Sequence, residues 1–164
     1  MLQRLSDRVN LATIVLCVAV FVAMLVISGS GIVASFVLRD PLTWNFPLLR
    51  AILPWLAMLS IPVAFKSGEH IAMETLVNAL PVAAQRAACI LQRLLVLAFA
   101  LGLLWYGARL FAGATQLIMI SATLQLPRWL TAASVPLTGA ILLVHAIAAL
   151  ASPLPADRGR AEPA

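Results

Sequence analysis

The two histidines, His70 and His145, are the side chains of this 164-residue chain that are best suited to hold a ligand. Two helices that face each other and carry one histidine each could clamp a b-type haem. A histidine beside a membrane interface more often forms a local hydrogen bond, and Glu74 lies one helical turn beyond His70. We keep a haem- or quinone-linked membrane anchor that uses His70 and His145 as an alternative to the function that the rest of the sequence favours.

The side chains that could support other chemistry are isolated from one another. A serine in an apolar helix usually donates to a carbonyl one turn back, and no base lies near these serines in the sequence. They are Ser28, Ser30, Ser60 and Ser134. Cys17 and Cys89 lack the paired spacing of a metal or redox site. We therefore expect no catalytic residue, no cofactor and no metal site, and we do not expect an enzyme.

The acidic residues all lie outside the core of the four long apolar stretches. They are Asp7, Asp40, Glu69, Glu74, Asp157 and Glu162. A carrier driven by protons or cations usually needs an ionisable or oxygen-rich site at bilayer depth. A small drug–proton antiporter is disfavoured because its first helix would need such a carboxylate. The sequence also has no evident internal repeat, so an inverted-repeat transporter is not supported.

The composition indicates that the bilayer is the solvent of this chain. Hydrophobic residues make up 63% of it and charged residues 10%, with a mean hydropathy of +1.03. Such a chain has too few charges to cover a soluble domain with a polar surface. The net charge of +5 arises from basic residues that are scattered singly, so we predict no contact with nucleic acid.

The predicted fold is an all-α integral membrane protein with four transmembrane helices and a short amphipathic interfacial helix between helices two and three. A span needs about 20 apolar residues to cross a hydrocarbon core of about 30 Å. The predicted spans are 10–34, 47–66, 89–112 and 130–151, in a membrane domain of residues 1–152. The interfacial helix is predicted over 69–80, and residues 153–164 are predicted to form a disordered cytoplasmic tail.

Local features of the spans predict their shapes. The first apolar stretch exceeds the roughly 7–15 residues of a secretory signal core, so we predict an uncleaved first helix. Pro54 and Pro62 should bend or loosen the second span, with Ser60 available to bond a freed carbonyl, and Pro136 should kink the fourth. A close-packing groove is predicted on the third span from residues at four-residue spacing, namely Ala98, Gly102 and Tyr106.

The interfacial helix is predicted from a change of period after Lys66. One face is apolar and holds Met73, Leu76, Val77 and Leu80. His70, Glu74 and Asn78 recur every four residues on another face. A helix this short and polar should lie along the membrane surface or against a partner.

The distribution of basic residues predicts the orientation. Seven basic residues lie near span ends on the side of the termini and four on the other side. Because cytoplasmic loops are enriched in Lys and Arg, both termini are predicted to be cytoplasmic. The connection from Gly113 to Trp129 is then external, and its apolar residues Leu117 to Ile120 should extend helix three or pack against another protein.

Arg50 is the most informative basic residue because it lies about one turn inside the second span. It could snorkel to the interface, or it could face inward and require a carboxylate or carbonyl partner. Asp40 or a partner subunit could provide that group.

The second span and the segment after it resemble a family signature. The resemblance covers Trp44 through Leu59 and Ala64 through Glu74, and the layout of the rest of the chain follows it, with Leu126-Pro127 before the fourth span and Pro136 inside it. The chain resembles the DctQ-like small membrane subunit of tripartite ATP-independent periplasmic (TRAP) transporters. The features of that family fall here on Trp44, Arg50, Trp55, Lys66, Gly68, His70, Ile71 and Glu74.

The resemblance implies a multi-pass subunit of the bacterial inner membrane that pairs with a large membrane subunit and a periplasmic solute-binding protein. It also implies import of organic acids with sodium and without ATP, by a complex in which this chain is an accessory scaffold. The candidates for the partner interface are Arg50, Trp55, His70, Met73, Leu76 and Val77. One departure is that family members often carry an acidic residue soon after the first tryptophan, where this chain has Asn45 and Phe46.

Overall fold

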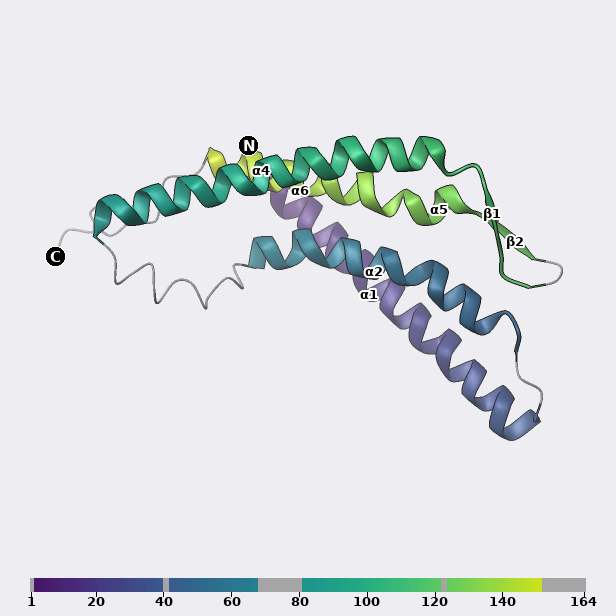
Figure 1. Cartoon of the computed structure of the whole chain (residues 1–164). Helices are drawn as coiled ribbons and strands as arrows, with labels where there is room; N and C mark the ends of the chain where they lie inside the picture. Colours follow the sequence, from purple (N-terminus) through teal and green to yellow (C-terminus); the bar gives the residue numbers. More distant parts are fainter. Residues whose placement is uncertain (1, 40–41, 68–80, 122–123, 152–164) are drawn as a thin grey trace.

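The computed structural model describes residues 2–39, 42–67, 81–121 and 124–151 (Figure 1). Its helices are α1 (Leu2–Val33), the π-helical continuation η1 (Ala34–Leu38), α2 (Asn45–Ser67), α4 (Val82–Gly113), α5 (Arg128–Ala132) and α6 (Ser134–Leu150). Two short strands, β1 (Leu117–Met119) and β2 (Gln125–Pro127), pair antiparallel between α4 and α5.

The described chain contains four helical stretches that are long and apolar enough to cross a membrane. They are Gln3–Val37, Asn45–Ser67, Ala83–Gly113 and Arg128–Leu150. The predicted all-α fold with four transmembrane helices is therefore confirmed. The predicted interfacial helix at 69–80 and the predicted tail at 153–164 lie outside the described residues.

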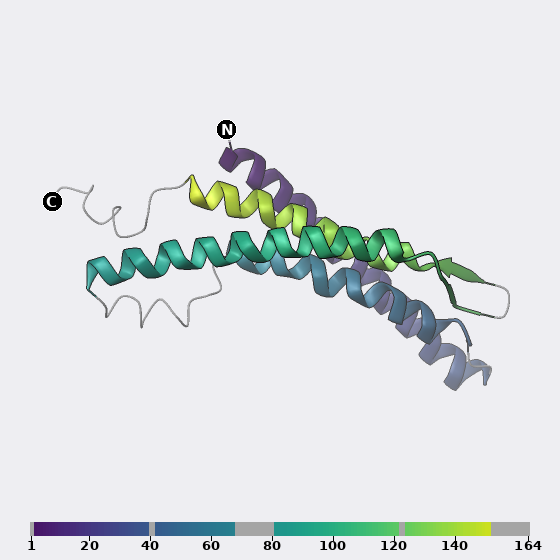
Figure 2. The same cartoon turned by 45° about the horizontal axis from the view of Figure 1, so that its top comes forward.

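The helices run antiparallel to their neighbours, so their ends gather at two poles of an elongated molecule (Figures 1 and 2). The terminal end holds the start of α1, the end of α2 and the end of α6, which side-chain bonds join to one another. The hairpin end holds η1, the start of α2 and the two strands. α1 lies against α6 near the terminal end and diverges from it toward η1.

Two glycines bring the backbones of α4 and α6 together, in the most extensive helix pairing of the structure. A Cβ atom on Gly107 would lie 2.7 Å from the nitrogen of Pro136, and one on Gly139 would lie 2.7 Å from the nitrogen of Leu104. Real Cβ atoms do not approach other atoms so closely. Small residues at helix interfaces allow this kind of close packing in membranes, where hydrophobicity does not drive helices together.

The predicted close-packing groove on α4 receives no other described helix of this chain. A Cβ atom added to Gly102 would meet nothing within 4 Å among the described residues, and Tyr106 is 70% exposed. α4 turns Gly107 toward α6 instead, five residues further along. The groove of Ala98, Gly102 and Tyr106 therefore remains open on the outside of the molecule.

The segment after α4 also differs from the prediction that it extends the third helix. Leu117, Ile118 and Met119 pair with Pro127, Leu126 and Gln125, and the Nη1 of Arg128 donates to the Oε1 of Gln116 at 2.9 Å beside the strands. The helix ends at Gly113, and the chain doubles back as a hairpin before α5 begins at Arg128. Leu117 and Met119 are exposed on the hairpin.

The prolines affect the two helices differently. The fourth span breaks at Ala133 into α5 and α6, three residues before Pro136, which agrees with the predicted kink. α2 continues as one helix through Pro54 and Pro62. Ser60 donates to the carbonyl of Ala57, not to the Met58 carbonyl that Pro62 frees, so the predicted role of Ser60 is wrong.

The close approach at Gly139 predicts a selective effect of adding one methyl group. Gly139→Ala should lower stability by about 1–3 kcal/mol because the α4 backbone cannot yield without shifting a helix. Gly29→Ala on α1 is the matched control, since a Cβ there meets nothing within 4 Å. The melting temperature of the purified protein in detergent measures both. Equal melting temperatures for the two variants would contradict the packing described.

Candidate functional site

The polar side chains at the terminal end form a connected network across three helices. Lys66 on α2 places its Nζ 2.6 Å from the Oδ1 of Asp7 and 2.8 Å from the Oγ of Ser6, both on α1. The Oγ of Ser6 lies 2.8 Å from the Nδ1 of His145 on α6. We call these four residues the polar network. It links α1, α2 and α6 through side chains alone.

The donors in this network can be assigned from its chemistry. The ammonium group of Lys66 has only donors, so the Oγ of Ser6 accepts from it and gives its own hydrogen to the Nδ1 of His145. The proton of the neutral imidazole is then on Nε2. That atom is buried and has no hydrogen-bond partner among the described residues. His145 therefore acts as an acceptor that holds α6 to α1.

The surroundings of His145 do not fit the haem alternative. Its side chain is 3% exposed, with Nδ1 occupied by Ser6. His70 lies outside the described residues. His145 is bonded, but its partner is not local in the sequence, because Ser6 lies 139 residues away on α1.

A second set of bonds joins α2 to α5 at the hairpin end. The Nε1 of Trp55 donates to the carbonyl of Leu130 at 3.0 Å, and the Oγ1 of Thr131 donates to the carbonyl of Ala51 at 3.4 Å. Each helix thus gives a side-chain donor to the backbone of the other. The polar atom of Trp55 is used within this chain, and the half-buried ring leaves only part of its surface for a partner.

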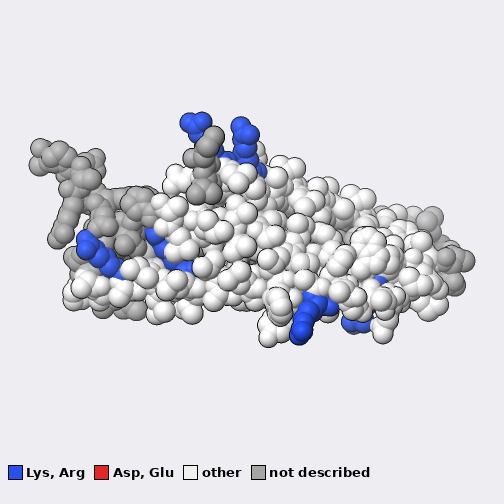
Figure 3. All heavy atoms as spheres, turned by 90° about the horizontal axis from the view of Figure 1, so that it is seen from above, with Lys and Arg blue, Asp and Glu red and all other residues white. Residues whose placement is uncertain are grey.

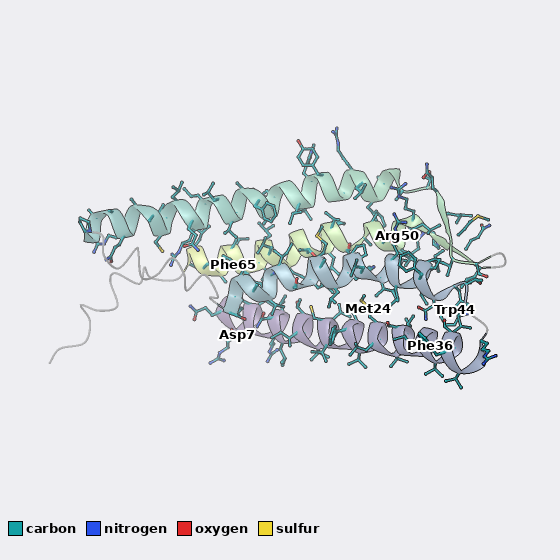
Figure 4. All side chains as sticks on the ribbon, turned by 60° about the horizontal axis from the view of Figure 1, so that its bottom comes forward. Asp7, Met24, Phe36, Trp44, Arg50 and Phe65 are labelled. Carbon is teal, nitrogen blue, oxygen red and sulfur yellow. The ribbon has the colours of Figure 1, made fainter. Side chains whose placement is uncertain are left out.

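Arg50 lies on the exposed side of α2, one turn before Pro54. Figure 4 places it in the half of α2 toward the hairpin end, near Trp44, which precedes the helix, while Asp7 lies at the opposite end of the molecule. Asp7, the one acidic residue among those described, is therefore not a partner for Arg50. Asp40, the other candidate partner, lies outside the described residues, as do His70, Met73, Leu76 and Val77.

Asn45 replaces the expected acidic residue with a donor that reaches across to α1. It is the first residue of α2, and its Nδ2 donates to the carbonyl of Ile27. Gly31 makes room for this amide, because a Cβ there would overlap the Asn45 side chain. A carboxylate has no hydrogen to give to a carbonyl. The contact is therefore specific to asparagine in this chain.

Sequence reasoning missed the roles of Ser6 and Asn45. A usable signal for Ser6 was the helical spacing of polar residues in the first apolar stretch, at Ser6, Asn10 and Thr13, of which Ser6 and Thr13 are buried. The described residues contain no group of three or more His, Cys, Asp or Glu side chains that could hold a metal ion.

The comparisons with known proteins agree with this architecture. The family model for the DctQ component of the tripartite ATP-independent periplasmic transporters matches residues 24–156. This chain belongs to that DctQ family. A Haemophilus influenzae protein named as a TRAP transporter small permease protein is 26% identical over 81 residues. The match covers 49% of this chain and 50% of the relative, so it spans about half the length of that relative.

Membership of the DctQ family and four apolar helices identify a multi-pass membrane protein of a transporter family, not of a known enzyme family. The matched region takes in α2, α4, the hairpin, α5 and α6, together with the part of α1 that receives Asn45. The N-terminal half of the polar network, Ser6 and Asp7, precedes it. The bond to His145 thus joins a DctQ helix to residues outside the match.

The polar network predicts that Ser6 matters more than Asp7. Ser6→Ala removes one of the two acceptors of Lys66 and the donor to the Nδ1 of His145, and a buried polar atom left without a partner costs about 1–3 kcal/mol. Asp7→Asn should cost less than about 1 kcal/mol, since the side chain of Asp7 is 68% exposed.

Unfolding in a titration with sodium dodecyl sulphate measures both variants. Ser60→Ala is the control for Ser6→Ala, because Ser60 bonds only within its own helix and is exposed. A loss of stability for Ser6→Ala no larger than that of Ser60→Ala would contradict the proposed link between α1 and α6.

Proposed function

We propose that this DctQ protein is the accessory small permease subunit of a TRAP-type secondary transporter that imports organic acids with sodium. It would pair with a large membrane subunit that carries the substrate pathway and would receive substrate from a periplasmic solute-binding protein. Family membership supports the transporter assignment. The packing of the helices supports an accessory role for this chain and a substrate pathway in the large subunit.

The observation that carries the proposal is the low burial of three of the four spans. We compare the share of residues that are buried in the most apolar 18-residue segment of each span. The share is 6% for α1, 11% for α2 and 6% for α4, but 39% for the last span. α6 therefore lies among the other helices, which leave most of their side chains facing outward. An open arrangement of this kind offers broad surfaces to lipid or protein and does not enclose a substrate pathway of its own.

The charges of the described helices also support an accessory role for this chain. Asp7 is bonded to Lys66 at the terminal end and does not lie at mid-membrane depth. A coupling ion needs oxygen ligands or a carboxylate at the centre of the bilayer. In this proposal the sodium site belongs to the large subunit, and this chain holds that subunit in the membrane.

The proposed docking surface for the large subunit includes the exposed side of α2. Arg50 is exposed and Trp55 half-buried there, and both belong to the features that resemble the family signature. Arg50 has the free donors to bond a carbonyl or carboxylate of a partner helix. The remaining interface candidates, His70, Met73, Leu76 and Val77, stay a proposal based on the sequence.

We further propose insertion in the bacterial inner membrane with both termini in the cytoplasm. In the described structure the terminal end gathers Arg4, Arg8 and Lys66, while Arg39, Arg50 and Arg128 lie toward the hairpin end. The basic residues visible in Figure 3 are dispersed rather than joined in one surface, which fits a topological role.

Reporter fusions test the orientation. Green fluorescent protein at the C-terminus should be fluorescent, and alkaline phosphatase inserted in the turn of the hairpin after Ser121 should be active, because that enzyme folds only outside the cytoplasm. An active phosphatase at the C-terminus would overturn the orientation. The prediction for the C-terminus does not depend on which substrate is transported.

The transport role is tested by reconstitution in proteoliposomes. This chain, its cognate large membrane subunit and the cognate binding protein should together take up a labelled organic acid when an inward sodium gradient is applied. Uptake should fall to background without this chain and should be absent with this chain alone. Uptake that is unchanged when this chain is omitted would reject the accessory-subunit proposal.

A further inference from the structure

The open groove on α4 is an apolar hollow on the described surface, and residues of α4 and α6 line it. Its volume is about 560 Å³. α4 forms its floor with Ala98, Phe99, Gly102, Leu103, Tyr106, Gly107 and Leu110, and Val135 of α6 contributes to one wall. Gly102 has no atom within 4 Å of the Cβ position, so the hollow is open at its centre. The hydroxyl of Tyr106 is its one side-chain polar group.

Arg109 follows the groove along α4, next to the lining residue Leu110, although Arg109 does not itself line the hollow. Arg109 is seven residues beyond Gly102, which is close to two helical turns, so the two residues share a helix face. The guanidinium carbon of Arg109 lies 5.6 Å from the ring centroid of Trp105, and this cation–π contact holds the charge beside the groove. Arg109 makes no ion pair with the described residues, whose single carboxylate, Asp7, is bonded to Lys66.

The length of the groove matches one leaflet of a bilayer. Ala98 and Arg109 are eleven residues apart, or roughly 16 Å along the helix, which is about half of a hydrocarbon core of roughly 30 Å. A hollow of this length can take one acyl chain of a lipid within a single leaflet. A lipid needs an apolar channel for one acyl chain with an anion-binding group at the interface end, and this is the arrangement on α4.

We infer that this groove binds one anionic phospholipid of the leaflet at the hairpin end. An acyl chain lies along Ala98, Gly102 and Tyr106, and the phosphate of the headgroup accepts hydrogen bonds from the Arg109 guanidinium. The planar donor fork of arginine suits a phosphate, and the contact with Trp105 reduces the freedom that Arg109 would lose on binding. The site does not depend on the proposed transport function.

Trp105 itself provides the test, because bromine atoms on a lipid chain quench nearby tryptophan fluorescence. The full chain carrying Trp44→Phe, Trp55→Phe and Trp129→Phe is placed in bilayers that contain either dibrominated phosphatidylglycerol or dibrominated phosphatidylcholine. The association constant for the anionic lipid should exceed that for the zwitterionic lipid roughly fivefold, the preference that one basic residue gives at a charged membrane surface.

Substitutions then separate the headgroup contact from the acyl channel. Arg109→Gln should bring the ratio of association constants to about one, and Arg109→Lys should restore part of it. Arg8→Gln is the matched control, since Arg8 is also an exposed arginine beside an apolar hollow, on α1, and should leave the ratio unchanged. Gly102→Leu should reduce the quenching by both lipids by filling the channel.

A second measurement uses the unaltered chain in case the tryptophan substitutions disturb the fold. Native mass spectrometry after extraction in mild detergent should show one retained phosphatidylglycerol per chain, lost in Arg109→Gln and kept in Arg8→Gln. Equal quenching by the two lipids together with no retained anionic lipid would overturn the inference. So would a Gly102→Leu variant that leaves lipid binding intact but no longer assembles with the large membrane subunit, since the groove would then receive a protein helix.

Discussion

Lipid tails are as apolar as leucine, so the helices of this protein gain little from hiding hydrophobic side chains from one another. The assembly depends instead on a few positions where backbones approach closely or polar atoms are bonded across helices. Gly107 and Gly139 bring α4 and α6 within backbone contact, and Ser6 and His145 bond α1 to α6. α6 takes part in both contacts, which explains why the last span is the most buried.

The polar contacts between helices lie toward their ends. The network of Lys66, Ser6 and His145 joins the terminal end, and the bonds of Trp55 and Asn45 join the hairpin end. Between these levels the apolar side chains of α1 and α4 face outward. This distribution leaves wide apolar surfaces facing outward on a set of helices that are bonded to one another toward the two ends of the molecule.

Much of the architecture could be predicted from the sequence because the bilayer restricts the possible folds so strongly. Every backbone group inside a membrane must be bonded internally, and long apolar stretches therefore have to be helices. The family resemblance was also accessible, because the residues around Arg50, Trp55 and His70 carry it in linear order. Pattern reasoning failed where the helical period of 3.6 residues could not be distinguished from the strand period of two. Leu117 to Met119 form such a segment, because a three-residue strand is too short to show alternation.

The sequence by itself determined the number of membrane-spanning helices, the absence of acidic residues from the centre of the spans and the family. These properties depend on the composition and on the order of neighbouring residues, both of which can be read directly from the sequence. Only the tertiary structure decided that Gly107 rather than Gly102 meets α6, that Ser6 finds His145, which is 139 residues away, and that Asn45 reaches Ile27. The face of a helix that meets its neighbour depends on how both helices are rotated and how they cross. A helix that is apolar all round has no polar side from which its rotation could be predicted.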